Sequence, residues 1–212
     1  MRNSKSSALK LFAIAVVDGP HIQSLAEGTT LIHYRALAAV VQPGDYASAT
    51  LDEKELDSYA AVVEAAFKHG AVLPAPPGTV FKSERTLADW LELHYFTLTD
   101  ALSTVEGHLS ARVTISAGRA VKYDGATKSF QALGAESLRL LRGHSTATVV
   151  LPLAEDDSKE GMVVKASFLV DNEKWAAFQE SVAAERRRHP ALDLQLTGPW
   201  PPYDFVRMQF GS

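Results

Sequence analysis

The sequence Leu196-Thr197-Gly198-Pro199-Trp200-Pro201-Pro202-Tyr203-Asp204-Phe205, near the end of the chain, decides how the last part of the protein folds. Three prolines and one glycine fall within five of its residues, which excludes a helix, because proline fixes φ and lacks a backbone N–H. Apolar and polar residues alternate over 192–196, as in a strand. A residue that precedes proline favours extended conformations. We therefore expect a stiff, kinked connector between two short extended segments, with Trp200 held in a nearly rigid frame.

Trp200 has two interpretations. Aromatic residues mostly serve packing, so the commoner role is to seal the edge of a core. The second role is to anchor a partner protein, because a ring that is already immobilised loses little entropy on binding. The motif alone leaves both open.

The composition is that of an ordinary globular protein, with 46% hydrophobic and 22% charged residues in 212. This length suits one large domain or two smaller ones. The net charge of −4 argues against a nucleic-acid partner. The chain has no cysteine, which excludes disulfides and fits a reducing compartment. No apolar run approaches the roughly 20 residues of a membrane span, so we expect no membrane association, and residues 9–17 are interpreted as a buried strand.

Hydrophobic periodicity predicts the α+β class in two domains, residues 1–107 and 108–212. The first domain has the order ββαβα. Its strands cover 9–17, an irregular stretch 30–41, and 71–81 around a Pro-rich loop. Its helices begin at Leu51, with Thr50 as N-cap, and at Ser83, the second running to about Val105.

The second domain has the order βαββαβ, which is a ferredoxin-like arrangement, followed by an extended Pro-rich C-terminal motif. Strands are predicted over 109–116, 146–153, 162–170 and the terminal stretch. Helices are predicted over 130–141 and from Asp171 or Asn172 to Arg188. Residues 154–161 are predicted to form a solvated acidic turn.

No catalytic motif is present, since the chain lacks HExxH, a Walker loop, GxSxG and GxGxxG. Its seven histidines do not have the spacing of a zinc site. His94 falls on the apolar stripe of a predicted helix and is interpreted as a core residue. We therefore predict no catalytic residue, no metal ligand and no cofactor. Rigid aromatic side chains beside the two Pro-rich loops favour an interaction protein over an enzyme.

Several stretches resemble the GvpL/GvpF family of gas vesicle accessory proteins. They are Gly70-Ala71-Val72-Leu73-Pro74 with Gly78-Thr79-Val80-Phe81, Phe168-Leu169-Val170-Asp171, residues 34–41, and the terminal motif 196–206, which is the most specific. The resemblance covers nearly the whole chain. One departure is Pro76-Pro77, where the family usually has Arg-Phe.

The resemblance implies a two-domain α+β protein with a ferredoxin-like C-terminal half. It implies a non-enzymatic role in the assembly of gas vesicles in the cytoplasm, with the hydrophobic shell protein and other accessory proteins as partners. A subunit with large apolar faces must be kept from aggregating until it is added to the shell. We predict protein-binding residues in the two Pro-rich motifs: Leu73, Pro74, Thr79, Phe81, Trp200, Pro201, Pro202 and Tyr203.

Two alternatives remain open. One is a ferredoxin-like small-ligand-binding domain or an oxygenase-type enzyme, which would need His94 or His108 in a pocket. The other is a scaffold outside gas vesicles, suggested by Pro76-Pro77.

Overall fold

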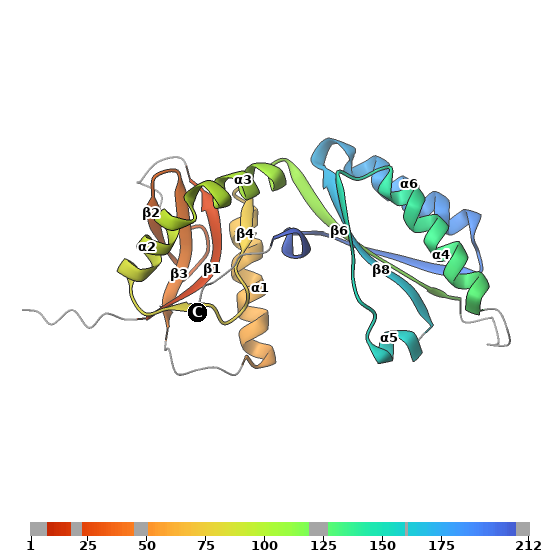
Figure 1. Cartoon of the computed structure of the whole chain (residues 1–212), viewed down its shortest axis with the longest axis horizontal. Helices are drawn as coiled ribbons and strands as arrows, with labels where there is room; N and C mark the ends of the chain where they lie inside the picture. The colour runs from red at the N-terminus through yellow and green to blue at the C-terminus, as the bar shows by residue number, and fades with distance from the viewer. Residues whose placement is uncertain (1–7, 18–22, 45–50, 119–126, 160, 207–212) are drawn as a thin grey trace, which may run out of the picture. The chain divides into compact units, whose positions relative to one another are not determined.

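The structure of the protein is a computed structural model that describes residues 8–17, 23–44, 51–118, 127–159 and 161–206 (Figure 1). The chain divides into two compact units. The first contains the chain through Glu106 together with the segment that begins at Pro201, and the second is Gly107–Trp200. The domains predicted from the sequence differ from these units after Trp200. That final segment joins the first unit, where Tyr203 packs against Tyr59.

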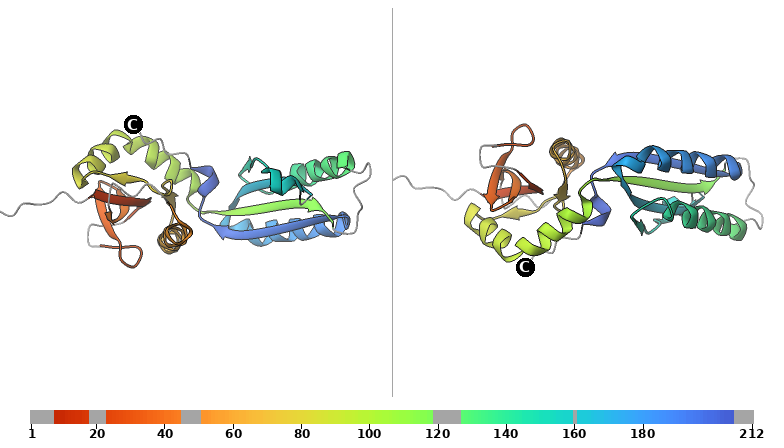
Figure 2. Two further views of the ribbon diagram at one scale, coloured as in Figure 1. Left: turned by 90° about the horizontal axis from the view of Figure 1, so that it is seen from below. Right: turned by 90° about the horizontal axis from the view of Figure 1, so that it is seen from above.

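The first unit is an antiparallel sheet with the strand order β2-β3-β1-β4, and with β5 also paired to β1. Helix α1 covers one face of the sheet, and α2 and α3 cover the other (Figures 1 and 2). Strand β1 reads as a continuous apolar run because both of its faces are buried. The elements are β1 Ala8–Val16, β2 Thr30–Tyr34, β3 Leu37–Gly44, α1 Glu53–Phe67, β4 Val72–Pro74, β5 Val80–Phe81, α2 Glu84–Leu93 and α3 Tyr95–Val105.

The stretch predicted as one irregular strand over 30–41 is instead a tight hairpin of β2 and β3. Tyr34 pairs with Leu37 across a turn of only two residues, Arg35 and Ala36. Arg35 adopts φ 54°, a conformation for which glycine or asparagine is usual at such turns. Because neither stands here, the sequence carried no hairpin signal.

The helix starts are set by side-chain caps. Ser83 caps α2 as predicted, with its hydroxyl accepting from the Thr86 N–H at 3.2 Å. The Asp52 carboxylate caps α1 by accepting from the Glu55 N–H at 2.8 Å, whereas the predicted cap Thr50 lies outside the described residues. The single helix predicted over 83–105 is two helices that meet at His94.

The second unit is a four-stranded antiparallel sheet with the strand order β7-β8-β6-β9. Helices α4 and α6 pack side by side on one face of this sheet (Figure 1). The inward residues of β6 alternate with polar ones, as in a half-buried strand, whereas β8 is buried at every residue from Ala166 to Val170. The elements are β6 His108–Ala117, α4 Thr127–Arg142, β7 Ala147–Val150, α5 Glu155–Lys159, β8 Met162–Asp171, the 3-10 turn η1 Asn172–Lys174, α6 Trp175–Arg188 and β9 Leu192–Trp200.

The predicted acidic turn contains the short helix α5. The Asp157 carboxylate accepts from the Ala154 N–H at 3.0 Å and lies 3.3 Å from the Lys165 ammonium. The pKa of Asp157 lies below its usual value, mainly because of the hydrogen bond from Ala154 and to a smaller extent because of Lys165. The acidic residues at the start of this helix also complement its dipole.

Strand β9 continues through Gly198 and Pro199 to Trp200 along the edge of the sheet, with an irregular pairing to β6 between Ser110 and Arg112. The Arg186 guanidinium donates to the Leu194 carbonyl of β9 at 3.0 and 2.6 Å. The second extended segment predicted after Trp200 is wrong for Tyr203–Phe205. These residues form a 3-10 turn, η2, closed by bonds to the carbonyls of Pro201 and Pro202. The predicted continuation beyond Val206 lies outside the described residues.

The α+β class predicted from the sequence is confirmed. None of the helices in the described ranges combines the length and hydrophobicity needed to cross a bilayer.

Candidate protein interaction site

The first predicted binding motif contributes mainly to the core of the first unit. Leu73 and Pro74 lie on β4, where they pair with Ile14 and Ala13 of β1, and both side chains are buried. Leu73 is 0% exposed. These two residues therefore hold the sheet together and present no side chain to a partner in this conformation.

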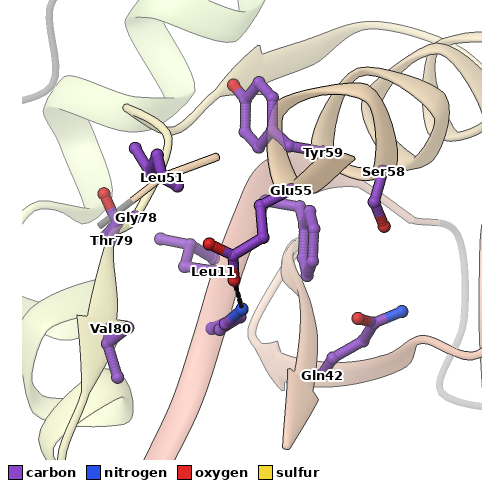
Figure 3. A pocket seen from close by; sticks show the side chains of 11 residues that line it. Leu11, Gln42, Leu51, Glu55, Ser58, Tyr59, Gly78, Thr79 and Val80 are labelled. Atoms are coloured by element: carbon purple, nitrogen blue, oxygen red, sulfur yellow. Dashed lines mark hydrogen bonds and ion pairs between the residues drawn. The ribbon is translucent and has the colours of Figure 1, made fainter. Parts of the chain in front are cut away.

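Thr79 lies beside a small pocket between α1 and β1 (Figure 3). Its hydroxyl donates to the Pro76 carbonyl at 2.6 Å, and its own carbonyl accepts from the Leu11 N–H at 2.9 Å. An ion pair of 2.8 Å between Lys10 and Glu55 also lines the pocket (Figure 3). The cavity volume is about 70 Å³, far below the roughly 300–1,000 Å³ of small-molecule sites. It has room for a side chain but not for a cofactor.

Phe81 begins a series of aromatic contacts along α2. Its ring lies 5.6 Å from that of Trp90, and Trp90 lies 4.9 Å from the ring of His94. His94 is half-buried and is the last residue before α3. The predicted residue Phe81 is thus connected, through packed rings, to the junction of the two helices.

Two large apolar side chains project into solvent at this junction: Leu93 is 78% exposed and Phe96 is 79% exposed. We call Leu93 and Phe96 the junction patch. The sequence prediction missed it, although a signal was present. Both residues fall outside the apolar stripe that ends in Leu98 and Leu102, on a helix face that is otherwise polar.

The second predicted motif is partly buried. Trp200 is 37% exposed, and its indole N–H donates to the Thr197 hydroxyl at 3.2 Å. Pro201 and Pro202 are buried, and Tyr203 is half-buried with its ring 6.4 Å from that of Tyr59. Of the four residues, Trp200 offers the most accessible surface.

Burial perturbs the two tyrosines of this contact. The Tyr59 hydroxyl donates to the Ala75 carbonyl at 2.5 Å. The pKa of Tyr59 is raised above its usual value, mainly by burial and to a smaller extent by the neighbouring Tyr203. Burial, and then the charge of Glu64, raise the pKa of Tyr203 to about 12.

We expect these pKa shifts to make the first unit less stable in alkaline solution. A phenol whose pKa is higher in the folded state than in the unfolded state contributes to stability. The contribution is fully present below the unfolded-state pKa of about 10. It is lost as the pH rises through the folded-state pKa of about 12. Urea unfolding between pH 8 and about 12 measures the loss. The Tyr203→Phe variant should lose less stability over this pH range than the wild type. An equal loss would contradict the claim that the ionisation of Tyr203 destabilises the fold.

His94 and His108, the two histidines considered for a pocket, each contact a neighbouring side chain. His108 Nε2 lies 3.1 Å from the Thr146 hydroxyl, and His94 packs on Trp90. Neither histidine lines the small pocket or the second cavity, which has a volume of about 400 Å³. In the ranges that the structure describes, no group of three His, Asp or Glu residues could hold a metal ion.

The second cavity is lined by His144, Ser145 and Asp171, which are the residue types of a hydrolytic triad. Asp171 instead caps η1 by accepting from the Glu173 N–H at 2.9 Å. The Ser145 hydroxyl lies 3.2 Å from the Arg142 carbonyl, to which it donates, and 3.1 Å from the Thr148 hydroxyl. Among the described residues no hydrogen bond joins the three side chains, so they lack the connection that activates a nucleophile.

The arginines at the end of α6 are engaged within the second unit. Arg186 bonds to Leu194, Arg187 pairs with Glu180 at 2.6 Å, and Arg188 pairs with Glu136 at 2.7 Å. Two of the three charges in the basic run are therefore paired with glutamates of the same unit.

Comparisons with known proteins agree with one another. The family model described as gas vesicle synthesis protein GvpL/GvpF matches residues 11–136 and 126–207. Gas vesicle protein F1 of Halobacterium salinarum is 27% identical over 191 residues, covering 88% of this chain and 85% of that protein. Gas vesicle protein F of Haloferax mediterranei is 26% identical over 192 residues, which cover 88% of this chain and 85% of that protein.

Two crystal structures share the fold. The gas vesicle protein GvpF from Anabaena sp. PCC7120 superposes with a TM-score of 0.80 at 17% identity, covering 98% of this chain and 99% of that one. GvpF from Microcystis aeruginosa superposes with a TM-score of 0.73 at 14% identity, and the match covers 95% of this chain and 100% of that one.

Proposed function

Because the chain belongs to the gas vesicle synthesis protein GvpL/GvpF family, we propose that it is a non-enzymatic accessory protein that binds the hydrophobic gas vesicle shell protein, other accessory proteins, or both. The observation that carries this proposal is the extent of the similarity, which spans 88% of the chain in a gas vesicle protein F1. The proposal places the protein in the cytoplasm, at the gas vesicle.

The proposal includes a two-domain organisation in which the second unit is ferredoxin-like. The strand order β7-β8-β6-β9, with two helices on one face, supports this assignment. A rigid sheet of this kind provides a firm base for Trp200 at the end of its edge strand.

The physical requirement for such a protein is a soluble surface with a few fixed apolar anchors. Rigid aromatic residues bind with little loss of conformational entropy. Among the residues predicted from the sequence, Thr79, Phe81, Trp200 and Tyr203 keep exposed surface. The buried members Leu73, Pro74, Pro201 and Pro202 would act by positioning them.

Binding to the shell protein is testable with a soluble shell-protein fusion immobilised on a biosensor. We expect association at micromolar concentration. Trp200→Ala should weaken it at least about tenfold, as expected when an aromatic anchor is removed, while changing the free energy of unfolding by less than about 1 kcal/mol, because the ring is already partly exposed.

The control is Val150→Ala, which shortens another exposed apolar side chain of the same unit. It should leave binding unchanged. The absence of association at micromolar concentration would refute shell-protein binding and favour a scaffold role with other partners.

A further inference from the structure

We propose that the junction patch, Leu93 and Phe96, is a docking surface for a protein segment that carries an apolar face flanked by basic side chains. This goes beyond the proposed function, because it assigns a new surface and a partner chemistry. It does not require the partner to be the shell protein.

The patch lies on the outer face of the two helices. Leu87, Leu91, Leu98 and Leu102 point inward and are at most 4% exposed, so Leu93 and Phe96 project away from the core. The exposed positions around the patch are polar. They are Arg85, Asp89, Glu92, Thr97, Asp100 and Ser103. Two large apolar side chains that are mostly exposed and lie three residues apart in such a setting are typical of an interaction site.

The patch rests on a packed aromatic base. The ring of Phe96 lies 5.5 Å from that of Tyr95, which packs 5.9 Å from the ring of Tyr34. The Arg35 guanidinium lies 5.0 Å from the Tyr95 ring centroid. These contacts hold the start of α3 in place, so the anchors are positioned before a partner arrives.

The charge around the patch identifies the partner chemistry. Asp89 precedes Leu93 by one helical turn, and Asp100 follows Phe96 by one turn. Glu92 is also exposed and directly precedes Leu93 in the sequence. In the described part of the chain, none of these three carboxylates makes an ion pair or a side-chain hydrogen bond. On the same helix Arg85 lies two turns before Leu93, and the Arg35 guanidinium stacks on tyrosine rings. Unpaired acids around an apolar centre are complementary to lysine or arginine around an apolar face.

The same acids disfavour two other occupants. Anionic lipid headgroups attract basic surfaces and are repelled by carboxylates. A second copy of the chain that docked through this patch would bring like charges together. A segment with an apolar face flanked by lysine or arginine would cover the two apolar side chains and place positive charges beside the carboxylates.

The experiment uses the full chain and two labelled amphipathic peptides of about 18 residues, or about five helical turns. Both have leucine on one face, flanked by lysine in one peptide and by glutamate in the other. Fluorescence anisotropy gives the affinities. We expect the lysine peptide to bind at least about tenfold more tightly than the glutamate peptide, and Phe96→Ser to weaken the lysine peptide at least about tenfold.

Two variants sharpen the test. Val150→Ser, at a side chain 51% exposed in the second unit, should leave both affinities unchanged. Replacing Asp89, Glu92 and Asp100 together by lysine should reverse the preference in favour of the glutamate peptide. Circular dichroism melting checks that each variant folds.

Four results would overturn the proposal. They are equal affinity for the two peptides, an affinity that Phe96→Ser does not change, binding to phosphatidylserine vesicles that depends on Phe96, and a dimer in sedimentation velocity that Phe96→Ser dissociates. None of these depends on the shell-protein assay, so failure here and failure of the proposed function are distinguishable.

Discussion

Phe178→Ala is expected to lower the free energy of unfolding of the second unit by about 3–5 kcal/mol. Phe178 lies on α6 and is 0% exposed, with its ring 5.2 Å from that of Phe168 on β8 and 6.4 Å from that of Trp175. Truncation removes the apolar contacts that attach α6 to the sheet. It also leaves a cavity that the surrounding fully buried side chains cannot fill.

Urea titration followed by tryptophan fluorescence measures this loss. The chain has three tryptophans, so a Trp90→Phe background leaves only Trp175 and Trp200 as reporters of the second unit. Val150→Ala is the control, because it shortens an apolar side chain of the same unit that is 51% exposed. It should change stability by less than about 0.5 kcal/mol. A loss below about 1 kcal/mol for Phe178→Ala would contradict the packing of α6 described above.

Gly198→Ala is expected to destabilise the second unit by about 2–3 kcal/mol. Gly198 has φ +127°, a conformation that other residues rarely adopt. A Cβ at this position would lie 2.8 Å from the Ser110 carbonyl oxygen of β6 and 3.3 Å from Trp175. Backbone strain and a backbone clash therefore act together.

Gly107→Ala separates these two contributions in the same unit. Gly107 also has a positive φ, +70°, but apart from its own two chain neighbours no described residue comes within 4 Å of the added Cβ. Strain alone should cost about 1 kcal/mol, and the same urea titration compares the two variants. Equal losses would show that the close approach of β6 to Gly198 is not maintained in solution.

The sequence supported the second unit better than the first. The alternation in β6 and the helical spacing of Trp175, Phe178 and Val182 are local signals. The hairpin at Arg35 had no such signal, because a non-glycine residue takes the positive φ. The break at His94 was hidden, because the apolar stripe continues in register across it.

Which residues of the candidate sites are exposed could not be predicted from the sequence, for a physical reason. Proline content indicates that a segment is stiff, but not which side of it faces solvent. Pro201 and Pro202 are buried, and Tyr203 packs on Tyr59, more than a hundred residues earlier in the chain. Such long-range contacts leave no local pattern. The junction patch, in contrast, had a local signal that the sequence analysis did not use, namely two large apolar residues among exposed polar ones.

The contact between Arg186 and Leu194 bears on aggregation. An uncovered edge strand is a template onto which a foreign strand can add and from which fibrils can grow. Here a guanidinium already occupies a main-chain acceptor of β9, so an intruding strand must first displace two hydrogen bonds to a charged group.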